Sequence, residues 1–344
     1  MEIYGVIKMN NHTHVYNFKK KINPSKFTVT QSEDDVVKSF YSNSYNLKTT
    51  SNEYKCQFIE AETTDYKKPH ILLCIKDNAE LLQFTLNNMK QNKIFDFANV
   101  LIIDDRSETE HIKAIALESD CSYMRVDNTA NQFNFSMLHN LATHALKTKS
   151  PNLKDIILWS SDLWTNNPEM LPILYKKHTE NKNTITGTKL LYPTKDFLYH
   201  KPDRADKVQY AGSMFGPRPN EVGLFALHMF RGYPKDDPKV NCNKGELFIT
   251  GAFLIIDAEW YIKTGGFCPS LKASYQDVDL CLRANEQDRR VMYYGKELYL
   301  YHYENLILNT MKEDLKKDQL SDKLWYKGFW EPERIKNLLY VNET

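Results

Sequence analysis

The sequence predicts an α/β fold of three layers, in which helices cover both faces of a mostly parallel central sheet. From Pro69 to Asp162, short apolar runs alternate with segments of helical spacing, which is typical of parallel strands joined by helices. The runs His70–Ile75 and Val100–Ile103 show no alternation of polar and apolar residues. Strands that are covered on both faces require such continuous apolar runs. The two observations together favour a parallel sheet buried between helices.

The first half of this pattern contains a regular series of elements. The expected strands are His70–Ile75, Val100–Ile103, Ser122–Val126 and Asp155–Trp159, and the expected helices are Asn78–Gln91, His111–Leu117 and Ser136–Lys147. In the first helix, Ala79, Leu82, Leu86 and Met89 fall on one face, as the helical period requires.

The second half has longer connections. We expect strands at Thr184–Tyr192, Lys207–Gly212, Phe248–Ile256, Val291–Tyr294 and Leu298–His302, and helices at Ala258–Thr264 and Asp277–Glu286. The segment Tyr210–Asn243 is either a loop that shapes a binding pocket or an ordinary surface insertion, since long loops in compact domains are often functional.

Both ends of the chain differ from this core. Residues 1–68 read as an N-terminal extension or small accessory module, with short strands at Glu2–Ile7 and Tyr54–Ile59. The main domain is expected at residues 69–305, and residues 306–344 as a helical tail. In that tail Trp325, Phe329 and Trp330 are available to dock on the body.

Composition and charge exclude some classes of function. The 344 residues include 42% hydrophobic and 26% charged residues, as in an ordinary globular protein. Lys and Arg number 45 and Asp and Glu 44, a net charge of +1 that argues against a nucleic-acid partner. Six scattered cysteines without a C-x-x-C pair indicate a reducing compartment and no zinc ribbon. No apolar run has the length of a signal or membrane span, so we expect a cytoplasmic protein.

Two expected strands end in acidic residues. Asp104 and Asp105 follow Leu101–Ile103, and Asp162 follows Asp155–Trp159 after two serines. Ligands of open α/β sheets bind at the carboxyl ends of the strands, where a carboxylate can accept from a ribose or base or hold a hard cation. The alternative is that these acids only form turns or cap helices.

A third group of candidate residues lies near the C-terminal end of the main domain. Asp277 and Asp279 fall at the start of an expected helix, whose dipole stabilises carboxylates. Asp279 can instead form a structural pair with Arg283, four residues on. His302 ends the last strand and could complete a metal site begun by Asp162, although most single histidines are not ligands.

Taken together, these segments resemble the family 2 inverting glycosyltransferases of the GT-A fold, and most closely the bacterial rhamnosyltransferase-like members. The resemblance runs from about Pro69 to Glu304. It rests on the strand end Ile102–Ser107 (IIDDRS), on Phe133–Ser136 with Asn140, on the block from Thr250 to Arg283 with Gly265–Phe267, and on His302–Glu304. The block from Thr250 to Arg283 is the most specific part of the resemblance.

The resemblance implies a sugar transfer from a nucleotide diphosphate sugar to a hydroxyl of a saccharide or lipid-linked saccharide, with inversion, in bacterial surface polysaccharide or lipopolysaccharide synthesis. It divides the domain into a nucleotide-binding half (69–190) and an acceptor half (191–305), and leaves open a peripheral contact at the inner face of a membrane. The implied roles are a general base in Asp277, nucleotide contacts in Asp104, Asp105, Asn78 and Asn140, a Mn²⁺ or Mg²⁺ site in Asp162 and His302, and acceptor or supporting contacts in Gln276, Asp279, Gly266 and Trp164.

Two positions depart from the family pattern. The metal-binding region reads Ser160-Ser161-Asp162, so its first carboxylate is missing, and Gln276 stands where a Glu usually precedes the base. A catalytically degenerate protein that binds a nucleotide sugar or carbohydrate is therefore the alternative. A nicotinamide dehydrogenase is disfavoured, because no G-x-G-x-x-G follows the first strand.

Overall fold

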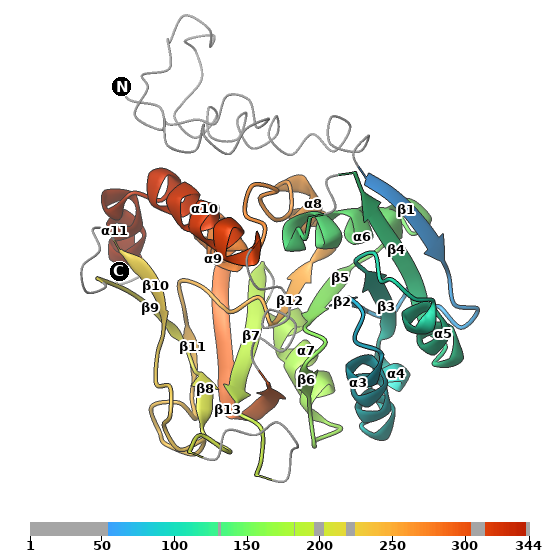
Figure 1. The fold of residues 1–344 in the computed structure, drawn as a ribbon. Coiled ribbons are helices and arrows are strands. Elements are labelled where there is room, and N and C mark those ends of the chain that lie inside the picture. Colours follow the sequence, from blue (N-terminus) through green and yellow to red (C-terminus); the bar gives the residue numbers. More distant parts are fainter. Residues whose placement is uncertain are drawn as a thin grey trace, which may run out of the picture.

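The computed structural model describes residues 54–129, 132–181, 183–195, 203–217, 224–303 and 314–341. Most of the strands belong to one large central sheet with helices on both faces (Figure 1). The predicted strand Glu2–Ile7 lies outside the described residues.

Within the described residues the central sheet has eleven strands, and its main path runs β1-β4-β3-β2-β5-β12-β7-β13-β11. Its strands are β1 Tyr54–Ile59, β2 His70–Ile75, β3 Asn99–Asp104, β4 Ser122–Asn128, β5 Asp155–Trp159, β6 Leu163–Trp164, β7 Thr184–Leu191, β8 Val208–Tyr210, β11 Asn243–Gly245, β12 Phe253–Asp257 and β13 Arg290–His302. Strands β4, β3, β2 and β5 are parallel, β12 runs antiparallel to β5 and β7, and β13 is parallel to β7. Two further strands, β9 Ser213–Gly216 and β10 Phe225–His228, form an antiparallel pair of their own.

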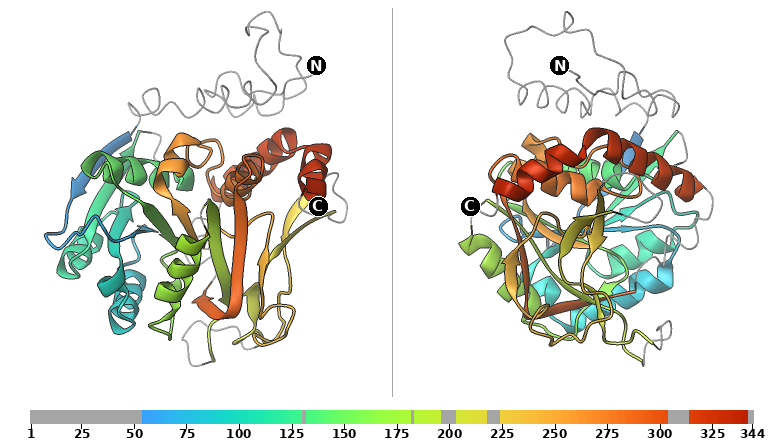
Figure 2. Two further views of the ribbon diagram at one scale, coloured as in Figure 1. Left: turned by 180° about the vertical axis from the view of Figure 1, so that it is seen from behind. Right: turned by 90° about the vertical axis from the view of Figure 1, so that its left-hand side faces the viewer.

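The direction of each crossover determines the face of the sheet on which its helix lies. The helices are α3 Ala79–Gln91, α4 Ile94–Phe97, α5 His111–Glu118, α6 Phe135–Lys149, α7 Met170–Glu180, α8 Ala258–Lys263, α9 Gln276–Asn285, α10 Asp314–Phe329 and α11 Pro332–Val341. The crossovers through α3 and α5 move along the sheet one way and the crossover through α6 moves back, so right-handed connections place α6 on the opposite face. Accordingly α3 contacts α5, and α6 contacts α8 (Figure 2).

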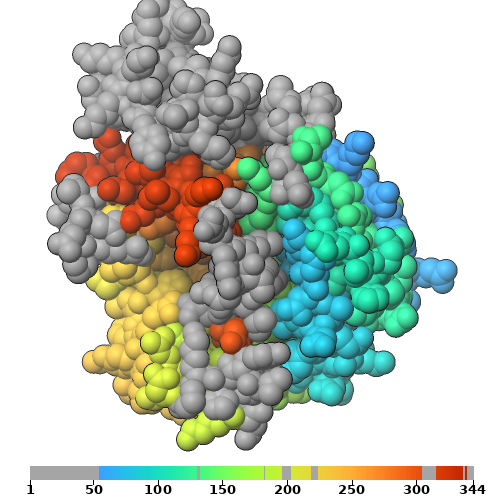
Figure 3. Space-filling view, in the orientation of Figure 1, coloured from blue at the N-terminus to red at the C-terminus, as the bar shows by residue number. Residues whose placement is uncertain are grey.

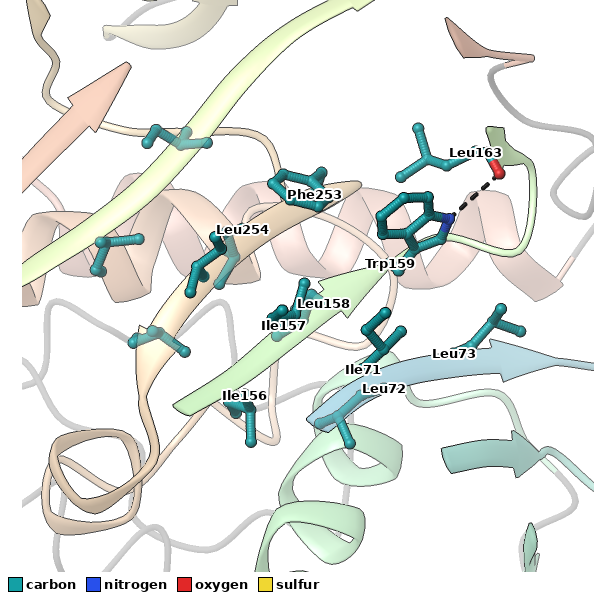
Figure 4. Close-up of a cluster of buried hydrophobic side chains, with 14 of the residues drawn as sticks. Ile71, Leu72, Leu73, Ile156, Ile157, Leu158, Trp159, Leu163, Phe253 and Leu254 are labelled. Atoms are coloured by element: carbon teal, nitrogen blue, oxygen red, sulfur yellow. Dashed lines mark hydrogen bonds between the residues drawn. The ribbon is translucent and has the colours of Figure 1, made fainter. Parts of the chain in front are cut away.

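The core lies where β2, β5 and β12 meet. Their side chains have almost no exposed surface, including Ile71, Leu158 and Leu254. Figure 4 shows this cluster, in which the indole Nε1 of Trp159 donates to the carbonyl oxygen of Leu163 at 3.2 Å. The buried hydrogen bond fixes the turn that follows β5, and that turn carries Ser160 to Asp162.

The structure corrects three boundaries of the expected elements. The pairing of β1 with β4 makes Tyr54–Ile59 an edge strand of the sheet, so the sheet begins before the expected boundary at residue 68. Strand β12 begins at Phe253, because Phe248–Ala252 is irregular and turns toward the strand ends. The two expected strands before His302 form one strand, β13, whose register shifts between Tyr294 and Tyr299. The left-handed Glu297, with a φ of 61°, lies in this bulge.

Helices α10 and α11 dock on the body as the tail's aromatic residues predicted. Trp325, Phe329 and Trp330 are all buried, and Trp325 stacks on Phe329 with ring centroids 4.8 Å apart. In the space-filling view these red helices lie on the outer face of the molecule, next to the yellow segment of the second half (Figure 3). No helix of the described chain is long and apolar enough to cross a membrane.

Candidate active site

A cavity of about 650 Å³ opens at the carboxyl ends of the central strands. Its walls come from the ends of β2, β3 and β5, from the irregular segment before β12, from the start of α9, from the end of β13 and from α10. Strands β2 and β5 are neighbours whose following connections run in opposite directions along the sheet, and ligands of α/β proteins bind at such a point. Asp105, Asp162, Asp277 and His302, which are far apart in the sequence, all line this one cavity.

Asp105 and Asp104 have different surroundings. Asp105 lines the cavity, and both of its carboxylate oxygens accept from the guanidinium of Arg106, at 2.7 and 3.0 Å. Burial raises the pKa of the Asp105 carboxyl, although Arg106 opposes the shift. Asp104 is fully buried and does not line the cavity; it accepts from the Ser107 amide at 2.8 Å and from the Tyr123 hydroxyl at 2.6 Å. Asp104 therefore holds the loop after β3 in place and leaves Asp105 as the acid that faces a ligand.

His302 and Asp162 lie next to each other in the cavity. The Nε2 atom of His302 lies 3.2 Å from Oδ1 of Asp162, and the Tyr303 amide donates to the Asp162 carbonyl oxygen at 3.1 Å. On the other side of the ring, Nδ1 lies 2.6 Å from Oε1 of Gln209, and Nε2 of Gln209 donates back to the His302 carbonyl oxygen at 3.3 Å. Because an amide oxygen only accepts, this pairing places the proton on Nδ1 and turns Nε2 toward the carboxylate.

This arrangement fits part of a divalent cation site. A metal-binding histidine usually donates its other ring N–H to an oxygen, as His302 does to Gln209. Two atoms about 3 Å apart also match neighbouring ligands of one octahedral cation at about 2.1 Å. Among the described residues, no group of three or more His, Cys, Asp and Glu side chains could hold a metal ion. Asp162 and His302 can thus contribute two ligands, and oxygen atoms of a bound diphosphate or water would have to supply the others.

Asp277 lies in the first turn of α9 with its carboxylate fixed by backbone amides. The Gly251 amide donates to Oδ2 at 2.6 Å and the Val278 amide donates to Oδ1 at 2.8 Å. Burial raises the pKa of this carboxyl, and the two amide hydrogen bonds oppose the shift. A Cβ atom at Gly251 would lie 3.2 Å from Cβ of Asp277, so the absence of a side chain there permits the close approach. A carboxylate with a raised pKa and a fixed orientation suits a general base.

Asp279 and Gly266 support the site from behind. Asp279 is fully buried, pairs with Arg283 at 2.9 Å, and accepts from the indole of Trp330 at 3.0 Å. Arg283 donates in turn to the Gly266 carbonyl oxygen at 2.7 Å. Gly266 has a φ of +69°, and a Cβ atom there would lie 2.2 Å from Oδ1 of Asn140. Neither Asp279 nor Gly266 lines the cavity, so their contribution is to hold the start of α9.

Three other expected contact residues also lie outside the cavity wall. Nδ2 of Asn140 donates to the Phe267 carbonyl oxygen at 2.8 Å. Its Oδ1 accepts from the Phe267 amide at 2.9 Å and from the Tyr261 hydroxyl. Asn78 caps α3 by accepting from the Leu81 amide at 3.0 Å. Trp164 packs against Tyr301 with ring centroids 5.6 Å apart. These three side chains contact other parts of the chain and do not line the cavity, while Gln276 does.

Sequence reasoning missed the contribution of α10. Gln319, Leu320 and Lys323 of this helix line the cavity. On the same helix the buried carboxylate of Asp322 accepts from the backbone amides of residues 272, 273 and 274, at 3.0, 2.7 and 2.8 Å. Tyr326 stacks on Tyr275, which has a φ of 63° and immediately precedes α9. Helix α10 therefore fixes the loop that leads into Asp277, and only a spatial contact reveals this.

No protein-family model matches the chain, and no curated protein matches it. Among solved structures it is similar to the crystal structure of GalNAc-T7 with UDP, GalNAc and Mn²⁺, with a TM-score of 0.52 and 10% sequence identity. The match covers 68% of this chain and 43% of that one, so this chain spans less than half of the solved structure. At this identity the match shows the fold alone: a mixed α/β fold with a mostly parallel central sheet, of the GT-A glycosyltransferase type.

Proposed function

We propose that the chain is a glycosyltransferase that moves a sugar from a nucleotide diphosphate sugar to a hydroxyl group with inversion. The observation that carries this proposal is the convergence of Asp105, Asp162, Asp277 and His302 on one cavity at the strand ends of a GT-A fold. Three acids and a histidine from four separate segments meet there, which turn formation and helix capping alone do not require.

The two halves of the cavity divide the work. At the donor end of the cavity, Asp105 would accept hydrogen bonds from the ribose or base of the sugar nucleotide. Arg106 holds its carboxylate. Asp162 and His302 would hold a divalent cation, which supplies Lewis-acid stabilisation of the leaving diphosphate when bound. Fixed groups aimed at developing charge in this way provide much of the catalysis in transfer reactions.

The acceptor hydroxyl would approach from the side of α9. There, Asp277 would take the hydroxyl proton on its carboxylate while the acceptor oxygen attacks the anomeric carbon and the bond to the diphosphate breaks. The Gly251 and Val278 amides keep the carboxylate oriented, and its raised pKa makes it a better proton acceptor than an exposed aspartate. In-line attack from the face opposite the leaving group gives inversion.

The finer assignments rest on the sequence resemblance. Membership of family 2, a rhamnosyltransferase-like donor choice, a saccharide or lipid-linked acceptor in bacterial surface polysaccharide synthesis, and a cytoplasmic location stay proposals. The GalNAc-T7 structure was solved with UDP and Mn²⁺, which supports testing uridine nucleotides and manganese first.

The test is turnover with a matched variant. We expect purified protein to release nucleoside diphosphate from at least one of UDP-glucose, UDP-GalNAc, GDP-mannose or dTDP-rhamnose in the presence of MnCl₂ and saccharide acceptors. Asp277→Asn keeps the size of the side chain and should lower turnover by about 10²–10⁴-fold, the usual contribution of a general base. Donor binding, followed by calorimetry, should be retained. Unchanged turnover in this variant would refute the assignment of the base.

One observation favours the second candidate, a protein that binds the sugar nucleotide without transferring the sugar. Ser160 stands where the family has a first metal-binding acid. Among the described residues of the cavity, only Asp162 and His302 form a pair that could bind the metal. This candidate predicts donor binding with no turnover under any metal condition. The same assay therefore separates the two.

A further inference from the structure

Two neutral side chains of the cavity have buried polar atoms without a partner. Among the described residues, the buried side-chain atoms that lack any hydrogen bond are Nδ1 of His70, Oγ of Ser161, Oε1 of Gln276 and the hydroxyl of Tyr326. Ser161 and Gln276 both line the cavity, while His70 and Tyr326 do not. Ser161 is 2% exposed and Gln276 is 7% exposed, so both side chains are almost entirely buried.

The acids beside these two residues, in contrast, have partners. The Asp277 carboxylate accepts from two backbone amides, and Asp162 faces His302. Buried polar groups nearly always have hydrogen-bond partners, because a buried donor or acceptor without a partner destabilises the fold. In this cavity the charged side chains have partners and these two neutral side chains do not. This difference indicates that a ligand provides the missing hydrogen bonds.

The chemistry of the pair defines that ligand. A primary amide offers two donors and one acceptor oxygen, and a serine hydroxyl offers one donor and can accept. The unpartnered Gln276 oxygen only accepts, so it complements a hydroxyl donor rather than a phosphate oxygen, and the Ser161 hydroxyl can pair with a hydroxyl as donor or acceptor. The χ1 torsion of Ser161 has three staggered positions and the terminal torsion of Gln276 is broad, so both polar groups can reorient toward a ligand.

The position of each residue assigns its partner. Gln276 directly precedes the proposed base, and Ser161 directly precedes Asp162 at the diphosphate end. We propose, resting on the proposed function, that Gln276 binds a hydroxyl of a neutral acceptor sugar next to the attacking oxygen and that Ser161 binds a hydroxyl of the transferred sugar. The substrate class is then a pair of neutral hexose-type sugars. The unpartnered Oε1 of Gln276 would accept from a hydroxyl of the acceptor sugar. Its Nε2 can also donate to a sugar oxygen, which an ionised Glu at this position could not do.

The first arm of the test measures the free protein. In Ser161→Ala and Gln276→Met the unpartnered atom is removed and the shape is nearly kept, so the melting temperature should be equal to the wild-type value or about 1–3 °C higher. Tyr326→Phe is the matched control, because it removes a buried unpartnered hydroxyl that lies outside the cavity. A fall of several degrees in the melting temperature of either cavity variant would show that its polar atom has a structural partner, and would overturn the proposal.

The second arm measures ligands. The probes are UDP-glucose, UDP-GalNAc, GDP-mannose and dTDP-rhamnose with MnCl₂, and methyl glycosides of glucose, galactose and rhamnose as acceptors. The wild-type chain and Tyr326→Phe should be stabilised to the same extent by the best donor. Ser161→Ala should weaken donor binding, and Gln276→Met and Gln276→Glu should raise the acceptor KM, each by about tenfold, with little change in the other constant. A wild-type chain that no probe stabilises would overturn the proposal, as would variants with unchanged constants.

The outcomes separate this inference from the proposed function. Donor stabilisation that depends on Ser161 but is followed by no turnover would refute sugar transfer and leave the donor half of the pair standing. Turnover that depends on Asp277 but is equal in the Ser161 and Gln276 variants would refute the pair and leave sugar transfer standing.

Discussion

The two walls of the cavity are built in different ways. In the first half, Asp105 and Asp162 follow parallel strands directly, and the regular sheet alone brings them to one edge. In the second half, His302 is oriented by Gln209, 93 residues away, and Asp279 by Trp330, 51 residues away. The loop before Asp277 is held by Asp322, 49 residues from Ala273. The first wall therefore depends on local order, and the second depends on contacts between distant segments.

The largest effect should come from Asp279, which binds Trp330, 51 residues away, and also pairs with Arg283 within α9. Asp279→Asn leaves the buried guanidinium of Arg283 without its charge partner, and breaking a buried pair in this way costs about 3–5 kcal/mol. The free energy of unfolding, measured in guanidinium chloride, should fall by about that amount. The loss should be accompanied by weaker protection of α10 and α11 in hydrogen exchange, since an amide has one acceptor oxygen for the donors of both Arg283 and Trp330.

Asn78→Ala provides the matched change in the first half. It removes the cap of α3, a contact over three residues, and should cost only about 1 kcal/mol. Equal losses in Asn78→Ala and Asp279→Asn would contradict the distinction between a locally ordered wall and one held by distant contacts.

A pH-dependent effect should come from Asp322. Burial raises the pKa of this carboxyl to about 7 against the amides of the loop that it holds, with Asp318 adding to the rise. An acid whose pKa is higher in the folded chain stabilises the fold fully below its unfolded pKa and loses that contribution as pH rises through the folded pKa. The wild-type unfolding free energy should therefore decrease between about pH 4 and pH 7 by about 1 kcal/mol per unit from this group alone.

The comparison is with Asp322→Asn, measured by chemical unfolding at several values of pH. This variant should be less stable than the wild type overall, because an amide cannot accept from all three backbone amides, but its profile should be flatter over the same interval. Since Asp105 and Asp277 also have raised pKa values and titrate in both proteins, only the difference between the two profiles reports on Asp322. Parallel profiles would show that its carboxyl does not titrate in this range.

The sequence predicted the first wall well for a physical reason. Continuous apolar runs identify buried parallel strands, and residues after such strands must lie at one edge of the sheet. The run Leu101–Ile103 therefore placed Asp105, and the run Ile156–Trp159 placed Asp162, without knowledge of any contact. The same reasoning could not tell Asp104 from Asp105, because which neighbour faces the cavity depends on Tyr123 and on the backbone of Ser107.

The second wall was predicted only in part. Asp277 and His302 were singled out by their places at a helix start and at a strand end, and the family resemblance gave them roles. The docking of the tail was predicted from its aromatic residues. The clamp from Asp322, the orienting role of Gln209 and the structural use of Asn140 were not foreseen, because each depends on a hydrogen bond between segments with no shared pattern in the sequence. An amide such as Asn140 looks the same in a sequence whether it binds a ligand or a loop.

The most direct test of the central claim is a crystal structure with UDP and Mn²⁺ bound. The account predicts the nucleotide beside Asp105 at the strand ends, the cation within bonding distance of Asp162 and of Nε2 of His302, and Asp277 across the cavity on the open side of the diphosphate. A nucleotide bound at another surface, or a cation that touches neither Asp162 nor His302, would contradict it.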